Sequence, residues 1–358
     1  MGVMDMHPVQ PGSAKYINEP KILLQLHDFI RDYGTKPFVL SGEKAFRAVE
    51  NNLDLQSYEW THNTFKGECS YENIHYYAEK VLELKSDVII AIGGGKVIDT
   101  AKAIGDRLNL PVITIPTVAS TCASWTPLSV IYTQEGTFIE YIMHSRGPSL
   151  VLVDPTILIE SPIRYFVAGI GDTFAKYYEA SALCQNQKIN AAARAGLEMA
   201  KLTYSILFEE SEEALKSIKK KAISQEFSDV LDAIFMTGGL VGGLGDKYGR
   251  IAAAHSIHNG LTNVPQTHHL YHGEKVAYGI FVQLILENRP FNEINQLIKL
   301  FQRLQLPVSF NDLGITSSEL DVISVASCQE NESIHLMPFA IDQEKVKKAM
   351  EDLEKMVN

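Results

Sequence analysis

The stretch "DVIIAIGGGKVIDTAKAIG", residues 87–105, joins three kinds of local pattern. Its β-branched start is typical of a buried strand, and its end has the composition of a helix. Between them stand three consecutive glycines, Gly93, Gly94 and Gly95. The stretch therefore predicts a strand, a short loop and a helix, which together form one βα unit of a parallel sheet.

The three glycines predict a phosphate site at the start of this helix. A helix N-terminus presents unpaired N–H groups and the positive end of a dipole, and glycine lets an anion approach without a Cβ in the way. A βα turn without a ligand is the alternative, but three glycines lose more backbone entropy than such a turn requires. Because the spacing differs from the GxGxxG dinucleotide fingerprint, the motif alone is a weak signal.

Outward from this unit, strand-like and helix-like runs alternate through the first half of the chain. The expected parallel strands are 37–42, 58–65, 87–95, 111–117 and 149–155. The run 128–143 surrounds the turn signal "QEG" and predicts a β-hairpin. From about residue 161 amphipathic helical patterns dominate. A chain of 358 residues should form about two domains, and we place them at 1–160, an α/β domain, and 161–358, an all-helical domain.

The composition is that of a globular protein that acts on small molecules. Apolar residues make up 46% of the chain and charged residues 21%, and no run approaches the roughly 20 apolar residues of a membrane span. A formal net charge of -11 without a basic cluster argues against nucleic acid and anionic lipid as partners. The N-terminus lacks a signal or transit pattern, and the four cysteines lack paired or metal-like spacing. We therefore expect a cytoplasmic protein with reduced thiols.

Histidines gather in one part of the chain. Five of the eleven lie between residues 255 and 272, and His255 and His258 are three residues apart on a helical pattern, so they can share a face. His272 follows a loop and begins another helix. Far upstream, the glycine-flanked Asp172 begins a helical stretch, where an acid is most often a cap. Two histidines and one aspartate from separate segments have the composition of a catalytic Zn2+ or Fe2+ site, although spacing does not choose which histidines bind.

Five segments together resemble the glycerol dehydrogenase branch of the iron-containing alcohol dehydrogenase superfamily. They are "AIGGGKVIDTAKAIG", "IPTVASTCASWTPLSVIYT", "AGIGDTFAKYYEA", "GGLVGGLGDKYGRIAAAHSIHNGLT" and "HGEKVAYG". The resemblance begins near residue 10, reaches the C-terminus and is greater for the hydroxycarboxylate dehydrogenases of this branch. It implies the dehydroquinate synthase-like fold, with a Rossmann-like parallel-sheet domain and an all-helical metal-binding domain. It also implies NAD or NADP as the coenzyme, and a homo-oligomer.

The resemblance also implies roles for single residues. The metal ligands would be Asp172, His255 and His272, with zinc preferred over iron, and His258 would act near the substrate or in proton relay. The coenzyme site would consist of Ser41, Gly93, Gly94, Gly95, Lys96, Asp99, Thr117, Ser120, Thr126, Leu128, Val130 and Tyr132. In that site the glycines would hold the pyrophosphate, and the residues from Thr117 onward would line the nicotinamide pocket.

Two departures from glycerol dehydrogenases concern the substrate. This chain reads "STCA" where they usually read "STDA", so Cys122 replaces an acid that would contact a polyol hydroxyl. Lys176, one turn beyond Asp172, replaces a small neutral residue and could bind a substrate carboxylate. The loss of an anion and the gain of a cation favour a 2-oxoacid or 2-hydroxycarboxylate. A structural ion pair of Lys176, for example with Glu179, is the alternative.

The choice between NAD and NADP depends on the end of the strand at 37–42. An acid at that position would hold the ribose hydroxyl of NAD and repel the 2′-phosphate of NADP. The chain has Ser41 and Gly42 there, followed by Glu43 and Lys44. NADP is therefore permitted and dual use is plausible, while Glu43 could still take the role of the acid.

We therefore expect a metal-dependent, NAD(P)-linked oxidoreductase that transfers hydride between nicotinamide and a small 2-oxoacid or 2-hydroxycarboxylate. The metal would act as a Lewis acid on the substrate oxygen, and His258, Cys122 and Lys176 would contact the substrate or carry its proton. Three alternatives stay open. They are a glycerol dehydrogenase, a 3-dehydroquinate synthase-like lyase, which would need more cationic residues, and a nucleotide sensor without turnover.

Overall fold

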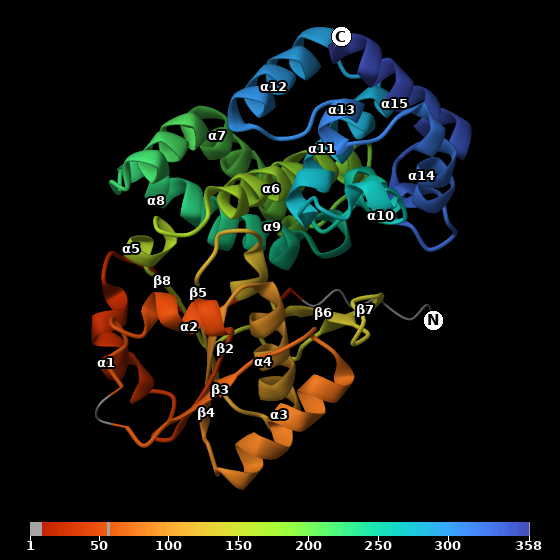
Figure 1. The fold of residues 1–358 in the computed structure, drawn as a ribbon. Helices are drawn as coiled ribbons and strands as arrows, with labels where there is room; N and C mark the ends of the chain where they lie inside the picture. The colour runs from red at the N-terminus through yellow and green to blue at the C-terminus, as the bar shows by residue number, and fades with distance from the viewer. Residues whose placement is uncertain (1–8, 56–57, 358) are drawn as a thin grey trace. The chain divides into compact units, whose positions relative to one another are not determined.

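The computed structural model describes residues 9–55 and 58–357 and divides into two compact units (Figure 1). One unit, here called the sheet unit, is formed by Gln10–Pro162 and Ser217–Gly239. The other, here called the helical unit, is formed mainly by Ile163–Lys216 and Leu240–Asn358.

A six-stranded parallel sheet forms the centre of the sheet unit. Its strands are β1 (Tyr16–Asn18), β2 (Pro37–Ser41), β3 (Thr61–Thr64), β4 (Val88–Gly93), β5 (Val112–Pro116) and β8 (Leu150–Val153), in the spatial order β1-β8-β5-β4-β2-β3. All five predicted strands are confirmed, and the short edge strand β1 is additional. The chain passes from β2 outward to β3 and returns to β4 on the other side of β2. The switch point of the sheet, where open parallel sheets bind ligands, therefore lies between β2 and β4.

Helices cover both faces of this sheet (Figure 1). The strand β4 shows the alternation, because Ile89 and Ala91 belong to one core and Ile90 and Ile92 to the other. The first core includes side chains of α3 (Tyr71–Glu83) and α4 (Gly95–Leu108), and the second includes those of α1 (Leu26–Ile30), α2 (Glu43–Val49) and α5 (Pro155–Leu158). A strand buried on both faces has a continuous apolar sequence.

Two further parts complete the sheet unit. The predicted hairpin is confirmed as the antiparallel pair β6 (Leu128–Tyr132) and β7 (Phe138–Met143). The second part is α8 (Gln225–Asp232) with the π-helical turn η3 (Ala233–Thr237), which the sequence analysis places in the helical domain. Asp232 Oδ1 explains the difference, because it accepts hydrogen bonds from Tyr16 Oη and Asn18 Nδ2, each at 2.7 Å.

In the helical unit no strand occurs among the residues that the structure describes. Its helices are α6 (Ile163–Cys184), α7 (Ala191–Lys220), α9 (Gly238–Gly245), α10 (Ala253–Thr262), α11 (His272–Leu286), α12 (Phe291–Leu304), α13 (Phe310–Leu313), α14 (Leu320–Ser327) and α15 (Gln343–Val357), of which α7 and α9 extend across the boundary between the units. Helix α11 packs against α6, α10 and α15. These contacts bury almost all of α11 beyond its first residue.

One stretch corrects an expectation from composition. Gln225–Tyr248 is long and apolar enough to cross a membrane by length and composition, whereas the sequence analysis finds no such run. Within the protein 61% of its most apolar window is buried, as in a core helix. The four cysteines form no disulfide, as expected.

Candidate metal centre and nucleotide site

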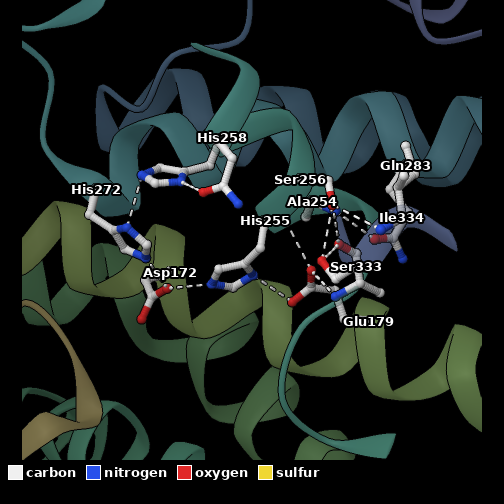
Figure 2. A network of polar contacts seen from close by, with 12 residues as sticks. Asp172, Glu179, Ala254, His255, Ser256, His258, His272, Gln283, Ser333 and Ile334 are labelled. Atoms are coloured by element: carbon white, nitrogen blue, oxygen red, sulfur yellow. Dashed lines mark hydrogen bonds and ion pairs between the residues drawn. The ribbon is translucent and has the colours of Figure 1, made fainter. Parts of the chain in front are cut away.

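Asp172, His255 and His272 lie together in the helical unit (Figure 2). They come from α6, α10 and α11, and one potential ligand atom of each lies within 4.8 Å of the other two. Asp172 Oδ1 is 3.5 Å from His255 Nε2 and 3.3 Å from His272 Nε2. Asp172 and His255 are buried, whereas the side chain of His272 is 44% exposed. The structure thus brings together the three residues that the resemblance implies as metal ligands.

The surroundings of Asp172 fit a cation. Its Oδ1 atom is buried and has no hydrogen-bond partner, which is unfavourable for a carboxylate oxygen. Burial disfavours its ionised form, but the charge of Lys176 and the two imidazoles outweigh burial and hold the pKa of Asp172 well below its usual range. One carboxylate and two imidazoles suit zinc and non-haem iron alike. These three side chains therefore fit a divalent metal.

Two glycines let the helices that carry Asp172 and His272 approach each other closely. A Cβ at Gly273 would lie 1.9 Å from the carbonyl oxygen of Ala168, and a Cβ at Gly171 would lie 2.7 Å from the carbonyl oxygen of Gly273. No real Cβ atom approaches backbone so closely, so both positions require glycine at this spacing of the helices. The crossing of α6 and α11 places the two candidate ligands next to each other.

The position of Asp172 in its helix corrects the sequence analysis. Helix α6 begins at Ile163, so Asp172 lies near its middle and is not an N-terminal cap. The glycine beside it, which indicated a helix start, serves the packing against α11 instead. Lys176 follows one turn later on α6 and is half-buried. Its positive charge lowers the pKa of both Asp172 and His255.

Glu179 orients His255, a role that the sequence analysis misses. Its carboxylate lies 2.8 Å from His255 Nδ1 and accepts hydrogen bonds from the backbone N–H groups of Ala252 and His255, at 2.7 and 3.1 Å. With Nδ1 engaged, Nε2 faces Asp172, as in carboxylate–histidine–metal triads. Burial disfavours the charged ring, but Glu179 and Asp172 outweigh burial and raise the pKa of His255 to about 9. The signal was the spacing, because residues seven apart on a helix share one face.

His258 begins a chain of hydrogen bonds that leads away from His272 (Figure 2). His258 Nε2 lies 2.9 Å from His272 Nδ1, and His258 Nδ1 lies 2.9 Å from Asn259 Oδ1. Asn259 Nδ2 then donates to the carboxylate of Glu332 at 3.0 and 3.1 Å. The directions agree if His272 carries its proton on Nδ1, which leaves its Nε2 lone pair facing Asp172. Desolvation, His272 and Lys275 lower the pKa of His258 well below its usual value, so the ring is neutral at pH 7.

The glycine run lies in the sheet unit, between β4 and α4. Gly93 ends the strand and Gly95 begins the helix. A Cβ at Gly93 would lie 3.1 Å from Cγ2 of Val97, which is tighter than ordinary contact. Lys96, in the first turn of α4, pairs with Glu68. The run therefore has the strand–loop–helix geometry that the sequence predicts, at the switch point of the sheet.

At the other side of the switch point, β2 ends in Ser41. This residue is buried, and its Oγ lies 2.7 Å from His62 Nε2. Glu43 begins α2 and pairs with Arg47 one turn later at 2.5 Å, and both side chains are about two-thirds exposed (67% and 69%). Ser41 is thus hydrogen-bonded to His62 within the sheet unit, and Glu43 and Arg47 form an ion pair in α2.

A buried ion pair on α4 organises the segment that precedes and includes β6. Lys102 Nζ lies 2.8 Å from Asp99 Oδ1, and Asp99 Oδ2 accepts a hydrogen bond from Val130 N at 3.1 Å. Lys102 also donates to the main-chain carbonyls of Ala123, Thr126 and Leu128. Asp99 is expected in the coenzyme site, but its contacts here are with the protein itself. No motif in the sequence indicates this role of Lys102.

The remaining residues of the predicted nicotinamide pocket follow in this same segment. They are Thr117, Ser120, Thr126, Leu128, Val130 and Tyr132, and Cys122, which is predicted to contact the substrate, lies among them in the sequence. Thr117 N donates to the carbonyl of Gly93 at 3.2 Å, which joins the segment to the glycine run. Trp125 anchors its middle, because its Nε1 donates to Pro11 O at 2.7 Å. The structure thus brings the predicted coenzyme residues together in the sheet unit and the predicted metal ligands together in the helical unit.

Comparisons with known proteins cover both units. A model of the family described as iron-containing alcohol dehydrogenase matches residues 13–155. Hydroxycarboxylate dehydrogenase A of Escherichia coli K12 is 38% identical over 352 residues, which make up 96% of this chain and 96% of the relative. Glycerol dehydrogenase of Citrobacter freundii is 35% identical and covers 96% of each chain. The crystal structure of a probable glycerol dehydrogenase from Sinorhizobium meliloti matches with a TM-score of 0.88 and 29% identity over 98% of each chain.

These relatives extend over nearly the whole chain and are named as dehydrogenases. They confirm the predicted fold class and the resemblance drawn from the sequence. The chain is therefore a dehydrogenase of the iron-containing alcohol dehydrogenase family, in the branch that holds glycerol and hydroxycarboxylate dehydrogenases.

Proposed function

We propose that this protein is a metal-dependent, NAD(P)-linked oxidoreductase that interconverts small 2-oxoacids and 2-hydroxycarboxylates. The observation that carries the substrate class is Lys176, a half-buried cation one turn from Asp172 whose charge lowers the pKa of that carboxyl. A cation beside the reacting centre favours a substrate carboxylate. Cys122 supports the same choice, because the resemblance drawn from the sequence implies an acid at this position in glycerol dehydrogenases. So does the 38% identity with a hydroxycarboxylate dehydrogenase.

Each residue of the candidate site in the helical unit then has a distinct role. A divalent metal at Asp172, His255 and His272, with zinc preferred over iron, would supply a Lewis acid for the substrate oxygen. Glu179 keeps Nε2 of His255 turned toward Asp172. The neutral ring of His258 can take up the substrate proton during oxidation and return it during reduction. His258 Nε2 is the atom concerned, and its lone pair would become available when it releases the hydrogen bond from His272.

The sheet unit would bind the coenzyme. The backbone of Gly93, Gly94 and Gly95 would hold the pyrophosphate at the start of α4, and the segment from Thr117 to Tyr132 would line the nicotinamide. Both NAD and NADP are proposed, because Ser41 is engaged by His62 and Glu43 is paired with Arg47, which can receive a 2′-phosphate. Binding constants for NADH and NADPH that differ by less than about tenfold, roughly 1.4 kcal/mol, would support dual use.

Glycerol dehydrogenase is the second candidate. It is favoured by the relatives of that name, at 35% identity in Citrobacter freundii and 33% in Pseudomonas putida. The lyase and sensor alternatives lose support, because the named relatives are dehydrogenases. A homo-oligomer stays a prediction, which light scattering would test.

One set of assays tests the proposal. The absorbance of reduced nicotinamide is followed with 2-oxobutyrate and NADH or NADPH, and with glycerol and NAD. Turnover of 2-oxobutyrate in preference to glycerol supports the proposal, whereas turnover of glycerol without 2-oxobutyrate contradicts the oxoacid preference. Chelation should abolish activity and Zn2+ or Fe2+ restore it, while full activity of metal-free protein would contradict metal dependence. His258→Ala should retain metal with a lower rate, and loss of metal would assign His258 to the support of His272 instead.

A further inference from the structure

Arg164 connects the two helices that carry Asp172 and His272. It lies in the first turn of α6, and Glu274 lies in the first turn of α11. Arg164 Nε donates to Glu274 Oε1 at 2.6 Å, and its Nη2 donates to Oε2 at 2.7 Å. Such a bidentate pair fixes both distance and orientation. Glu274 is only 6% exposed, so the pair differs from a solvated surface bridge.

The same pair controls where α11 begins. Glu274 Oε2 accepts a hydrogen bond from Tyr271 N at 2.7 Å, as in a capping box, and the next residue is His272, the first residue of the helix. Tyr271 is held in two further ways. The guanidinium of Arg164 lies 4.5 Å from its ring centroid, and the ring of Tyr165 stacks on it at 4.7 Å. Arg164 thus contacts Tyr271, which precedes α11, and Glu274 in the first turn of α11, and Tyr165 adds a second contact with Tyr271.

The loop before α11 is also tied to Arg164. Arg164 Nη2 donates to the carbonyl oxygen of His269 at 2.8 Å, so one guanidinium binds the loop, the cap and the first turn. On the other side of His272, Gly273 sets how closely α11 can approach α6. The glycine contact limits how near the helices come, and the Arg164 contacts limit how far apart they move.

We infer that Arg164 is a positioning residue for the metal centre, which sets the separation of His272 from Asp172 through Glu274 and Tyr271. The inference rests on the metal site of the proposed function. A purely structural role would lower the thermal unfolding temperature of the metal-free protein but leave the Zn2+ affinity of the folded protein unchanged. A positioning role lowers that affinity, because groups that orient metal ligands typically contribute about 10- to 100-fold.

The experiment compares wild type, Arg164→Ala and Arg164→Lys after removal of metal. Zn2+ affinity is measured by competition with a chromophoric chelator, and the absorption spectrum of the Co2+ form reports ligand geometry. We expect Arg164→Ala to weaken Zn2+ binding about 10-fold or more and to change the Co2+ spectrum. Arg164→Lys should restore part of the affinity, because lysine keeps the charge but not the bidentate geometry. If Arg164→Ala does not fold, Glu274→Gln keeps the cap and breaks the ion pair, with the same expected direction.

Arg303→Ala is the matched control. Arg303 binds Glu212 through two nitrogens at 2.8 and 2.7 Å and is 53% exposed, against 44% for Arg164. It joins α12 to α7, and neither helix carries a candidate ligand. The Zn2+ affinity of the Arg303→Ala protein should equal that of wild type. Equal affinity and an unchanged Co2+ spectrum in Arg164→Ala would overturn the inference, whereas wild-type protein that binds no Zn2+ would overturn the proposed function itself.

Discussion

The imidazole ring of His255 lies between two carboxylates. Asp172 and Glu179 lie on either side of its ring, at 3.5 Å from Nε2 and 2.8 Å from Nδ1, and all three side chains are buried. Two buried negative charges are costly unless positive charge offsets them. Without a metal, a proton on His255 offsets part of that charge, which is why its pKa rises to about 9 although burial opposes the charged ring. A divalent metal ion at this site would offset the negative charges of both carboxylates.

The first prediction concerns Glu179. In Glu179→Gln the side chain keeps its shape and one acceptor oxygen but loses the charge that supports His255 Nδ1. We expect Zn2+ affinity to fall by about 10- to 100-fold, as for other groups that orient metal-binding histidines. Competition with a chromophoric chelator measures the affinity. Unchanged affinity would mean that Glu179 serves only the backbone N–H groups of Ala252 and His255.

The second prediction concerns Lys176. A charged hydrogen bond contributes about 1.5–3 kcal/mol, so Lys176→Met should raise KM for 2-oxobutyrate by about 10- to 100-fold. Glycolaldehyde has no carboxylate and serves as the control substrate, for which the change should be small. Steady-state kinetics with both substrates decide the matter. An equal loss for both would assign Lys176 to the electrostatics of Asp172 instead of to the substrate.

Among the elements, α6 and α11 matter most for the site, and both depart from simple patterns. α6 contains glycines in its interior, which normally disfavour a helix by about 1 kcal/mol each, yet it continues through them because Gly171 lies against the backbone of α11. α11 begins at the candidate ligand His272 itself. The crossing therefore combines a close backbone contact with a helix start at one place.

The third prediction tests this crossing. Gly273→Ala adds a Cβ that would lie 1.9 Å from Ala168 O, so the helices must separate. Overpacking typically lowers the free energy of unfolding by about 1–3 kcal/mol, and Zn2+ affinity should fall with it. Gly245→Ala is the control, because a Cβ there meets nothing within 4 Å. Denaturant unfolding and Zn2+ titration measure both effects, and a Gly273→Ala protein with wild-type Zn2+ affinity would contradict the account.

The fourth prediction concerns the segment beside β6. Lys102→Met removes the cation that binds three main-chain carbonyls and leaves Asp99 buried without its partner. Breaking a buried pair in this way costs about 3–5 kcal/mol, and coenzyme affinity should also fall, because the predicted nicotinamide pocket lies in that segment. Lys201→Met removes an exposed pair with Glu198 and should cost less than about 1 kcal/mol. Denaturant unfolding and fluorescence titration with NADH measure the two quantities. Undiminished NADH affinity in a folded Lys102→Met protein would separate the ion pair from coenzyme binding.

For the whole molecule, features that depend on local sequence patterns could be predicted, whereas features that depend on long-range contacts could not. Four predictions depend on neighbouring residues, and each is confirmed as secondary structure. They are the alternation of strands with helices in the first half, the strand–loop–helix form of the glycine run, the hairpin turn and the start of α11. The assignment of 217–239 depends instead on Asp232, which binds residues more than 200 positions earlier. Such a contact leaves no periodic signal in either segment.

The candidate site also contains residues that could be predicted from the sequence and residues that could not. The resemblance supplied Asp172, His255 and His272, but the groups that orient them, Glu179 and Arg164, have ordinary helical spacing in the sequence. The true start of α6 was also hidden, because glycine disfavours a helix interior locally and the packing of Gly171 against α11 cannot be read from the sequence. Sequence patterns record which side chains are present, and much of this site depends on which backbones touch.

The fifth prediction concerns which of the two units each ligand protects from hydrogen exchange. Zn2+ should slow amide hydrogen exchange in α6, α10 and α11 of the helical unit, whereas NADH should slow it in the loop at Gly93–Gly95 and in the segment from Thr117 to Tyr132 of the sheet unit. Ligands protect the elements whose opening would disrupt binding. Exchange measured by mass spectrometry resolves these peptides. Protection of the sheet unit alone on addition of Zn2+ would contradict the assignment of the metal to the helical unit.

The glycine crossing also bears on protein engineering. Metal selectivity is usually redesigned by exchanging ligands and enlarging or shrinking the residues around them. Between Asp172 and His272 the closest approach of the helices is limited by two backbones in contact, and this limit cannot be changed by exchanging a larger side chain for a smaller one. Redesign must therefore begin with the side chains that orient the candidate ligands, which are Glu179 beside His255 and the Arg164–Glu274 pair beside His272. A library that randomises Gly171 or Gly273 should return chiefly glycine.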